Sequence, residues 1–128
     1  MRNMIYTNNS SASAVTANSA IPLGSAVHGY GKGIRLVNNG IEIRSCGYYE
    51  VEVSVTATQT TATDTFTVQL YKDGVAIPGA LASATGTVID LTIPYVIRRG
   101  CEPSSVYTVV STLAGTINDV SVVVKELV

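Results

Sequence analysis

The chain has 128 residues, a length that suits one domain with a sizeable hydrophobic core. Only 13% of the residues are charged, the formal net charge at pH 7 is −1, and the mean hydropathy is +0.31. These values argue against a basic nucleic-acid-binding surface, and no apolar run approaches the roughly 18 residues of a membrane helix. We therefore expect no nucleic-acid partner and no membrane partner. The dispersed apolar surface favours burial against further copies of the chain.

Residues 1–18 are expected to form an extended N-terminal arm, followed by one domain over residues 19–128. The stretch NNSSASAVTANS is small and polar, as in many disordered chain starts. A second interpretation stays open, in which the arm is a tether that docks on a neighbouring protein through Met4, Ile5 and Tyr6. The start of the chain lacks the basic and apolar segments of a signal peptide, so we expect an untargeted cytoplasmic product.

A hairpin is predicted for the stretch IRLVNNGIEIR. Asn39-Gly40 supplies the two positive φ angles that a type I′ turn needs. Glu42 then lies on one face of the hairpin between two arginines, Arg35 and Arg44, which offsets their like charges.

The segment from Arg44 to Thr58 predicts a long strand with one face in a core. Its inward residues alternate with polar ones and are Tyr49, Val51, Val53 and Val55. Glu50 and Glu52 lie on the opposite face, which raises the question of what that face meets in a chain with few charges.

Another strand, TFTVQLY, alternates in the same way and leads into a second tight turn. Asp73-Gly74 forms this turn, with Lys72 opposite Val75 and Leu70 opposite Ile77.

The longest strand candidate is Thr87–Gly100. Its inward face consists of Ile89, Leu91, Ile93, Tyr95 and Ile97. Pro94 has no N–H for a strand ladder, which predicts an edge strand or a bulge. Two more alternating segments follow, SSVYTVVSTL and VSVVVKELV, and no segment has a convincing helical period. The sequence therefore predicts an all-β fold, an antiparallel β-sandwich.

Catalysis has little support. The single histidine, His28, lies in a Gly-rich loop, so any triad or cysteine–histidine pair would depend on it alone. The aspartates lack calcium-loop spacing, and the glycines of Gly29–Gly33 lack the phosphate-loop pattern. We expect no enzyme, no catalytic residue, no cofactor and no metal site.

Cys46 and Cys101 leave three interpretations open. They are buried free thiols, a disulfide formed after release to an oxidising exterior, or a redox-active pair. Two cysteines are too few for a disulfide scaffold or a zinc site.

The order of segments resembles a known family. The run IEIRSCGYYEVEVSVTAT, with its alternation and its Gly-x-Tyr start, resembles the third main strand of the tumour necrosis factor-like jelly roll. This superfamily includes the globular heads of complement-type collagens. TVQLYKDGVAIPGALAS, a long strand ending in RRG, SSVYTVVSTL and VSVVVKEL are similar to segments of its bacterial and phage relatives. The resemblance covers Asn18–Val128 and implies a jelly roll of about 8–10 strands that forms a compact homotrimer.

The resemblance also implies a pairing of strands. The strand that begins near Tyr48 would run antiparallel to the one that ends near Arg99, and the latter would form a sheet edge. This pairing would place Cys46 near Cys101, as a disulfide or as adjacent thiols.

A further implication concerns the face that carries Glu50 and Glu52. In the family, this face is directed toward the trimer interior or its rim. A carboxylate near such an interface needs a partner, and Arg98 on the antiparallel strand is the candidate for Glu50.

The family relatives include tips of collagen-like spore-surface proteins and decoration or fibre proteins of bacteriophage virions. No Gly-X-Y repeat precedes the domain, which favours the virion type. We expect a trimeric capsid-decoration or short-fibre protein, anchored to a shell protein through its arm and located in the virion. The alternatives are a trimeric receptor- or glycan-binding tip, with Tyr30 as a candidate contact, and a spore- or cell-surface coat protein.

Overall fold

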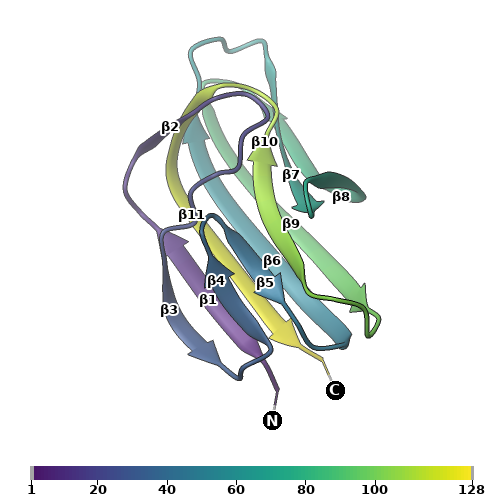
Figure 1. The fold of residues 1–128 in the computed structure, drawn as a ribbon. Coiled ribbons are helices and arrows are strands. Elements are labelled where there is room, and N and C mark those ends of the chain that lie inside the picture. Colours follow the sequence, from purple (N-terminus) through teal and green to yellow (C-terminus); the bar gives the residue numbers. More distant parts are fainter. Residues whose placement is uncertain (1, 128) are drawn as a thin grey trace.

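A computed structural model describes residues 2–127, which form a sandwich of two antiparallel sheets (Figure 1). Met1 and Val128 lie outside the described residues. The strands are β1 (Met4–Asn9), β2 (Ser13–Val15), β3 (Ser25–Tyr30), β4 (Ile34–Val37), β5 (Gly40–Ile43), β6 (Gly47–Thr58), β7 (Thr65–Lys72), β8 (Val75–Thr85), β9 (Val88–Arg99), β10 (Ser105–Ser111) and β11 (Gly115–Glu126). The predicted all-β antiparallel sandwich is confirmed.

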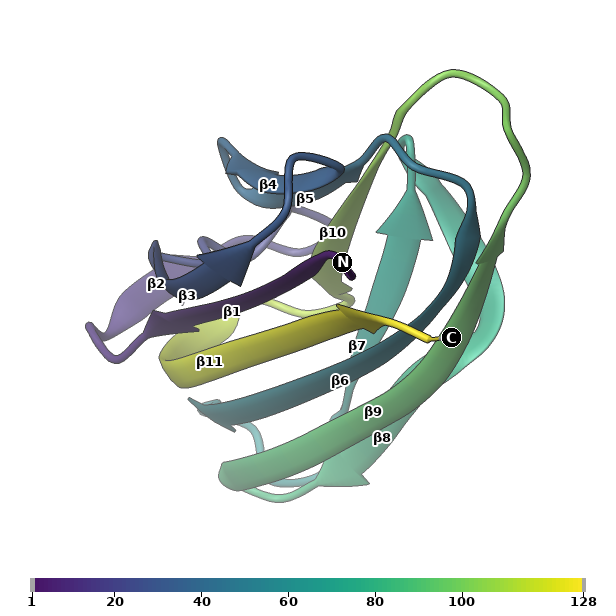
Figure 2. The same ribbon diagram turned by 90° about the horizontal axis from the view of Figure 1, so that it is seen from below.

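The first sheet has the strand order β3-β1-β11-β6-β9, with β2 added beside β11, and the second has the order β4-β5-β10-β7-β8. Successive strands often change sheet, as in a jelly roll. Figure 2 shows the two sheets as facing layers, with the edge strands β8 and β9 next to each other. The prediction that β9 is an edge strand is confirmed, and Pro94 lies opposite Glu52 of β6.

The core lies between the two sheets. The predicted inward residues of β6 are buried, as are Ile89, Leu91, Ile93 and Ile97 of β9, while Tyr95 is half-buried. A cavity of about 10 Å³ remains between the layers, lined by apolar side chains and Tyr107. This space is at the lower limit for one water molecule, so it cannot serve as a ligand site.

The expected N-terminal arm is corrected by the structure. Met4–Asn9 is strand β1, which pairs with β11 on one side and with β3 on the other. Ile5 and Thr7 point into the sandwich and are 3% and 0% exposed. The small polar residues beyond β1 contribute a short strand as well, in which Val15 is buried. Residues 2–18 are therefore part of the sandwich. Their backbone N–H and C=O groups are hydrogen-bonded to strands that are distant in the chain, which the local composition does not reveal.

The first hairpin turn is also corrected. Asn38 and Asn39 form it, and Val37 lies opposite Gly40. Asn38 has a positive φ of 53°, whereas Gly40 belongs to β5, where a Cβ atom would overlap the side chain of Val106. Gly40 is thus required by packing and not by the turn.

The predicted charge pairing of this hairpin is confirmed. Glu42 Oε1 lies 2.7 Å from Arg35 Nε and 3.7 Å from Arg44 Nε.

The second hairpin has the predicted turn, with Lys72 opposite Val75 and positive φ at Asp73 and Gly74. The predicted pairing of Leu70 with Ile77 is wrong. The register shifts between Gln69 and Tyr71, so that residues 77–80 of β8 stand opposite a single β7 residue. This bulge interrupts the regular ladder between β7 and β8, on the side of the sandwich where β8 lies next to β9.

Candidate interaction surface

The outer face of the first sheet carries most of the side chains that the sequence singles out. Backbone register aligns them in rows that run across all five strands. One row is Tyr30, Met4, Lys125, Glu50 and Val96, and the next is His28, Tyr6, Val123, Glu52 and Pro94. These side chains are exposed or half-buried. They form the aromatic and apolar half of the face, which we call the outer patch.

The rows farther from the termini are small and polar. They include Asn8, Ser121, Ser54 and Thr92. Asn8 Nδ2 donates hydrogen bonds to Asp119 Oδ1 and to Ser121 Oγ, each at 2.9 Å. The face is therefore divided into a hydrogen-bonded polar band and the outer patch.

The arm-anchor candidates lie on β1 at the outer patch. Met4 and Tyr6 point outward, whereas Ile5 belongs to the core and is not available to a partner. The ring of Tyr6 stacks on His28 with centroids 6.3 Å apart. His28 is thus an exposed residue of β3, beside an aromatic ring of the same face.

Glu50 does not pair with Arg98 as expected. Glu50 Oε1 lies 3.8 Å from Nζ of Lys125, which is directly opposite it on β11. Arg98 is opposite Tyr48 and is one of the residues that line a groove between β8 and β9 at the sheet edge. Within residues 2–127, neither Glu52 nor Arg98 forms an ion pair or a side-chain hydrogen bond. The sequence register missed Lys125, because β11 is distant in the chain.

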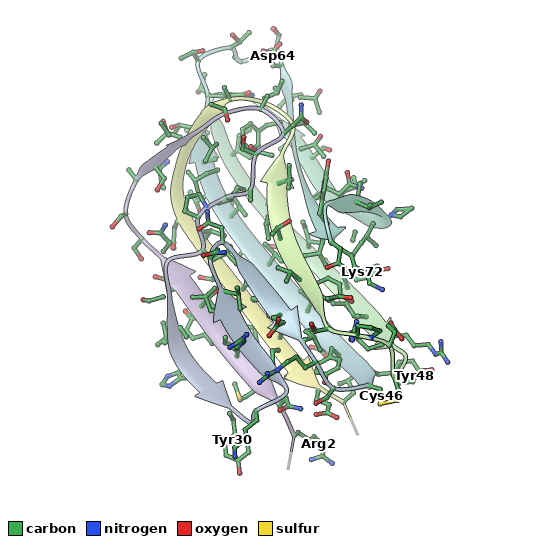
Figure 3. All side chains as sticks on the ribbon, in the orientation of Figure 1. Arg2, Tyr30, Cys46, Tyr48, Asp64 and Lys72 are labelled. Atoms are coloured by element: carbon green, nitrogen blue, oxygen red, sulfur yellow. A yellow bond between two sulfur atoms is a disulfide. The ribbon has the colours of Figure 1, made fainter. Side chains whose placement is uncertain are left out.

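Cys46 and Cys101 are brought together at the end of the sandwich where the termini lie (Figure 3). They form a disulfide with Cα atoms 4.8 Å apart and a sequence separation of 55. Cys46 directly precedes β6 and Cys101 follows β9, whose residue Arg99 is paired with Gly47. The disulfide therefore continues the β6–β9 ladder beyond its last backbone pair.

Arg99 is a residue that the sequence reasoning overlooked. Its guanidinium is buried beneath the loop that carries Cys101 and donates to Ser105 Oγ at 2.7 Å. It also donates to the carbonyl oxygens of Glu102 and Pro103, at 3.2 and 2.9 Å. The alternation of β9 could have predicted that Arg99 points inward, because it follows the inward Ile97 by two residues.

Burial around this arginine affects a neighbouring tyrosine. Desolvation raises the pKa of the Tyr107 hydroxyl, and the positive charge of Arg99 opposes that rise. The buried guanidinium therefore anchors the β9–β10 loop through its hydrogen bonds.

Asn3 and Glu126 join the two ends of the chain. Asn3 donates from its backbone N and from Nδ2 to Glu126 Oε1, at 3.0 and 2.9 Å, while its Oδ1 accepts from the backbone N of Gly33 at 2.9 Å. A Cβ atom at Gly31 would overlap Asn3, and one at Gly33 would overlap Ser45. Close packing thus accounts for Gly33, and close packing together with a positive φ of 88° accounts for Gly31.

Residues 2–127 contain no group of three or more His, Cys, Asp or Glu side chains that would hold a metal ion. They also contain no helix long and apolar enough to cross a membrane.

No protein-family model matches the sequence, and no curated protein matches it significantly. Solved structures do match the fold, and they are tumour necrosis factor-like and complement C1q jelly-roll proteins. Murine APRIL superposes with a TM-score of 0.78 and 10% identity, over 99% of this chain and 100% of that one. Vertex protein P5 of phage PRD1 gives 0.70 and 10%, over 98% and 97% of the two chains. The globular domain of zebrafish complement 1qA gives 0.71 and 8%, over the same shares. The fold of this chain is thus a tumour necrosis factor-like jelly roll.

Proposed function

We propose that the chain is a non-enzymatic structural protein of a virion, which assembles as a homotrimer and decorates a capsid or projects from it as a short fibre. The outer patch carries this proposal. Large apolar side chains remain in solvent there, with Tyr30 47% and Val96 54% exposed, and Val27 beside the patch 49% exposed. Burying such surface contributes roughly 25 cal/mol per Å² of apolar area, which favours association with further copies.

The likeness to the vertex protein of phage PRD1 supports the virion role, because that protein shares nearly the whole length of the fold. Strands β1 and β2 belong to the sandwich, so attachment to a shell protein would use the surface of the assembled domain and not an arm.

The oligomeric part of the proposal is tested by light scattering coupled to size exclusion at micromolar concentrations. We expect a mass three times the 13.4 kDa of one chain. Replacing Val96 and Val123 of the outer patch by Asp should give a folded monomer, whereas the same change at Val75, which is 70% exposed on β8, should leave the mass unchanged. A monomeric wild-type chain would contradict the proposal.

The virion part is tested with an antibody against the chain, which is used to probe virus particles purified from cells that produce it. We expect several copies on each particle, and their complete absence from intact particles would contradict a decoration or fibre role.

A second candidate function is a trimeric tip that binds a receptor or a glycan. Tyr30 and Tyr48 favour it, since they lie at the same end of the sandwich and Tyr48 is 52% exposed (Figure 3). Aromatic side chains with a polar tip are common in binding surfaces. A glycan array probed with the wild type and with a Tyr30→Ala/Tyr48→Ala variant would decide this, and equal signals from both would remove the candidate.

A further inference from the structure

Glu52 of β6 and Arg98 of the edge strand β9 carry opposite charges, and neither has an ion-pair partner among residues 2–127. We propose that neighbouring copies in the homotrimer join through an ion pair between Glu52 of one copy and Arg98 of the next. This inference rests on the proposed homotrimer and assigns the residues that set the contact between its copies.

The acidic side of the contact is a shallow groove on the outer face, between β6 and β9. It is lined by Glu50 and Glu52 on one strand and by Pro94, Tyr95 and Val96 on the other. Glu50 is partly neutralised by Lys125, whereas Glu52 is exposed and has no charged partner within the described chain. The groove therefore presents the carboxylate of Glu52 beside the apolar side chains of Pro94 and Val96.

The basic side is the groove at the sheet edge, between β8 and β9. Its lining includes Arg98, Lys72, Ile77 and Ile97, and it forms where the β8 bulge leaves the regular ladder. Lys72 lies 3.8 Å from the exposed Glu102, whereas Arg98 has no acidic partner among residues 2–127. Arg98 thus presents its charge at the edge, next to apolar surface.

Glu52 and Arg98 of the same chain are too far apart to pair. Glu52 lies opposite Pro94, and Arg98 is four residues farther along β9. At about 3.3 Å per residue, this separation is about 13 Å along the strand. A contact between the two charges therefore requires two copies of the chain.

The contact also has the symmetry that a ring needs. Glu52 and Arg98 lie at different positions on the outer side of the first sheet, so a contact that joins Glu52 of one copy to Arg98 of the next in the proposed homotrimer is heterologous. Heterologous contacts form a ring when the rotation between copies closes, as the proposed homotrimer requires, and an open filament when it does not. Charge complementarity at an interface sets the register of the partners and excludes arrangements with like charges in contact.

Charge reversal tests the pair. Glu52→Lys and Arg98→Glu should each raise the concentration at which the trimer dissociates, by about tenfold or more, because each places like charges together. The double variant restores opposite charges and should return the dissociation concentration to within about threefold of the wild type. Asp64→Lys, in the loop at the opposite end of the sandwich, and Lys32→Glu are the matched controls and should dissociate like the wild type.

A second measurement does not depend on affinity. A tagged chain with Glu52→Cys is mixed and reassembled with an untagged chain carrying Arg98→Cys, and a short bismaleimide is added. We expect a covalent product that contains one chain of each kind, and none when Thr67→Cys on the other sheet replaces Arg98→Cys.

The failure of this inference differs from the failure of the proposed function. A monomeric wild type would refute the homotrimer itself. Three outcomes with a trimeric wild type would overturn the Glu52–Arg98 pair and leave the homotrimer standing. The single reversals keep the wild-type dissociation concentration, the double variant does not restore it, or the cysteine variants do not cross-link.

Discussion

Replacing Arg99 by Met is expected to destabilise the sandwich strongly, although it changes no exposed residue. The substitution keeps much of the side-chain volume but removes three hydrogen bonds, to Ser105 and to the carbonyls of Glu102 and Pro103. Without the guanidinium, the Ser105 hydroxyl and the two carbonyls lose a donor, and each buried polar group left without a partner costs about 1–3 kcal/mol. The carboxylate of Glu102 is 44% exposed and returns to water without a large penalty, so we expect a total cost of about 3 kcal/mol.

Thermal unfolding followed by circular dichroism measures this change. For a domain of this size, about 1 kcal/mol corresponds to roughly 4 °C, so Arg99→Met should unfold about 10 °C below the wild type at equal chain concentration. Arg35→Met is the matched control, because Arg35 is 57% exposed in its ion pair and such pairs contribute at most about 1 kcal/mol. Equal midpoints for the two variants would refute the conclusion that the buried guanidinium holds the β9–β10 loop.

Three further predictions concern the disulfide, a glycine and a tyrosine. Replacing both Cys46 and Cys101 by Ser should lower the free energy of unfolding in urea by about 4 kcal/mol, the loop-closure value for their separation of 55 residues, and an unchanged value would contradict a stabilising disulfide. Gly40→Ala should cost about 1–3 kcal/mol through overlap with Val106, and the added Val106→Ala should recover part of that loss; a loss that Val106→Ala leaves unchanged would point to the backbone instead. Because burial raises the pKa of Tyr107 above 10.0, the unfolded state loses this proton first and stability should fall as the pH rises through about 10 and above. Urea titrations of the wild type and Tyr107→Phe at alkaline pH should show a shallower decline for the variant, and identical slopes would contradict this role.

Two of the longest strands were predictable because burial on one face imposes a period of two. The apolar alternation of β6 identified its inward residues, and that of β9 did the same up to Ile97. Pro94 added the edge position, since a missing N–H excludes it from the middle of a sheet. The same alternation extended to Arg99, but a charge at an inward position is interpretable only when its acceptors are known.

The errors arose where a residue's role depends on a distant neighbour. The polar segment at the start of the chain looked disordered because only Ile5, Thr7 and Val15 turn inward, and β11 lies more than 100 residues away. The turn of the first hairpin was predicted one residue too late, because Gly40 is needed for packing against Val106 of another strand and not for the turn.

Side-chain alternation and turn residues were sufficient to predict the strands from β4 to β11, the faces of β6, β7 and β9 that lie in the core, and two tight hairpin turns at Asn or Asp. These properties depend on residues that are close in the chain, where side-chain alternation and local φ preferences act. Contacts between distant strands place β1 between β11 and β3, pair Lys125 with Glu50, and leave Glu52 and Arg98 without an ion-pair partner among residues 2–127. Alternation specifies the face of a strand but not its neighbour, because the neighbour is selected by the packing of the whole sandwich.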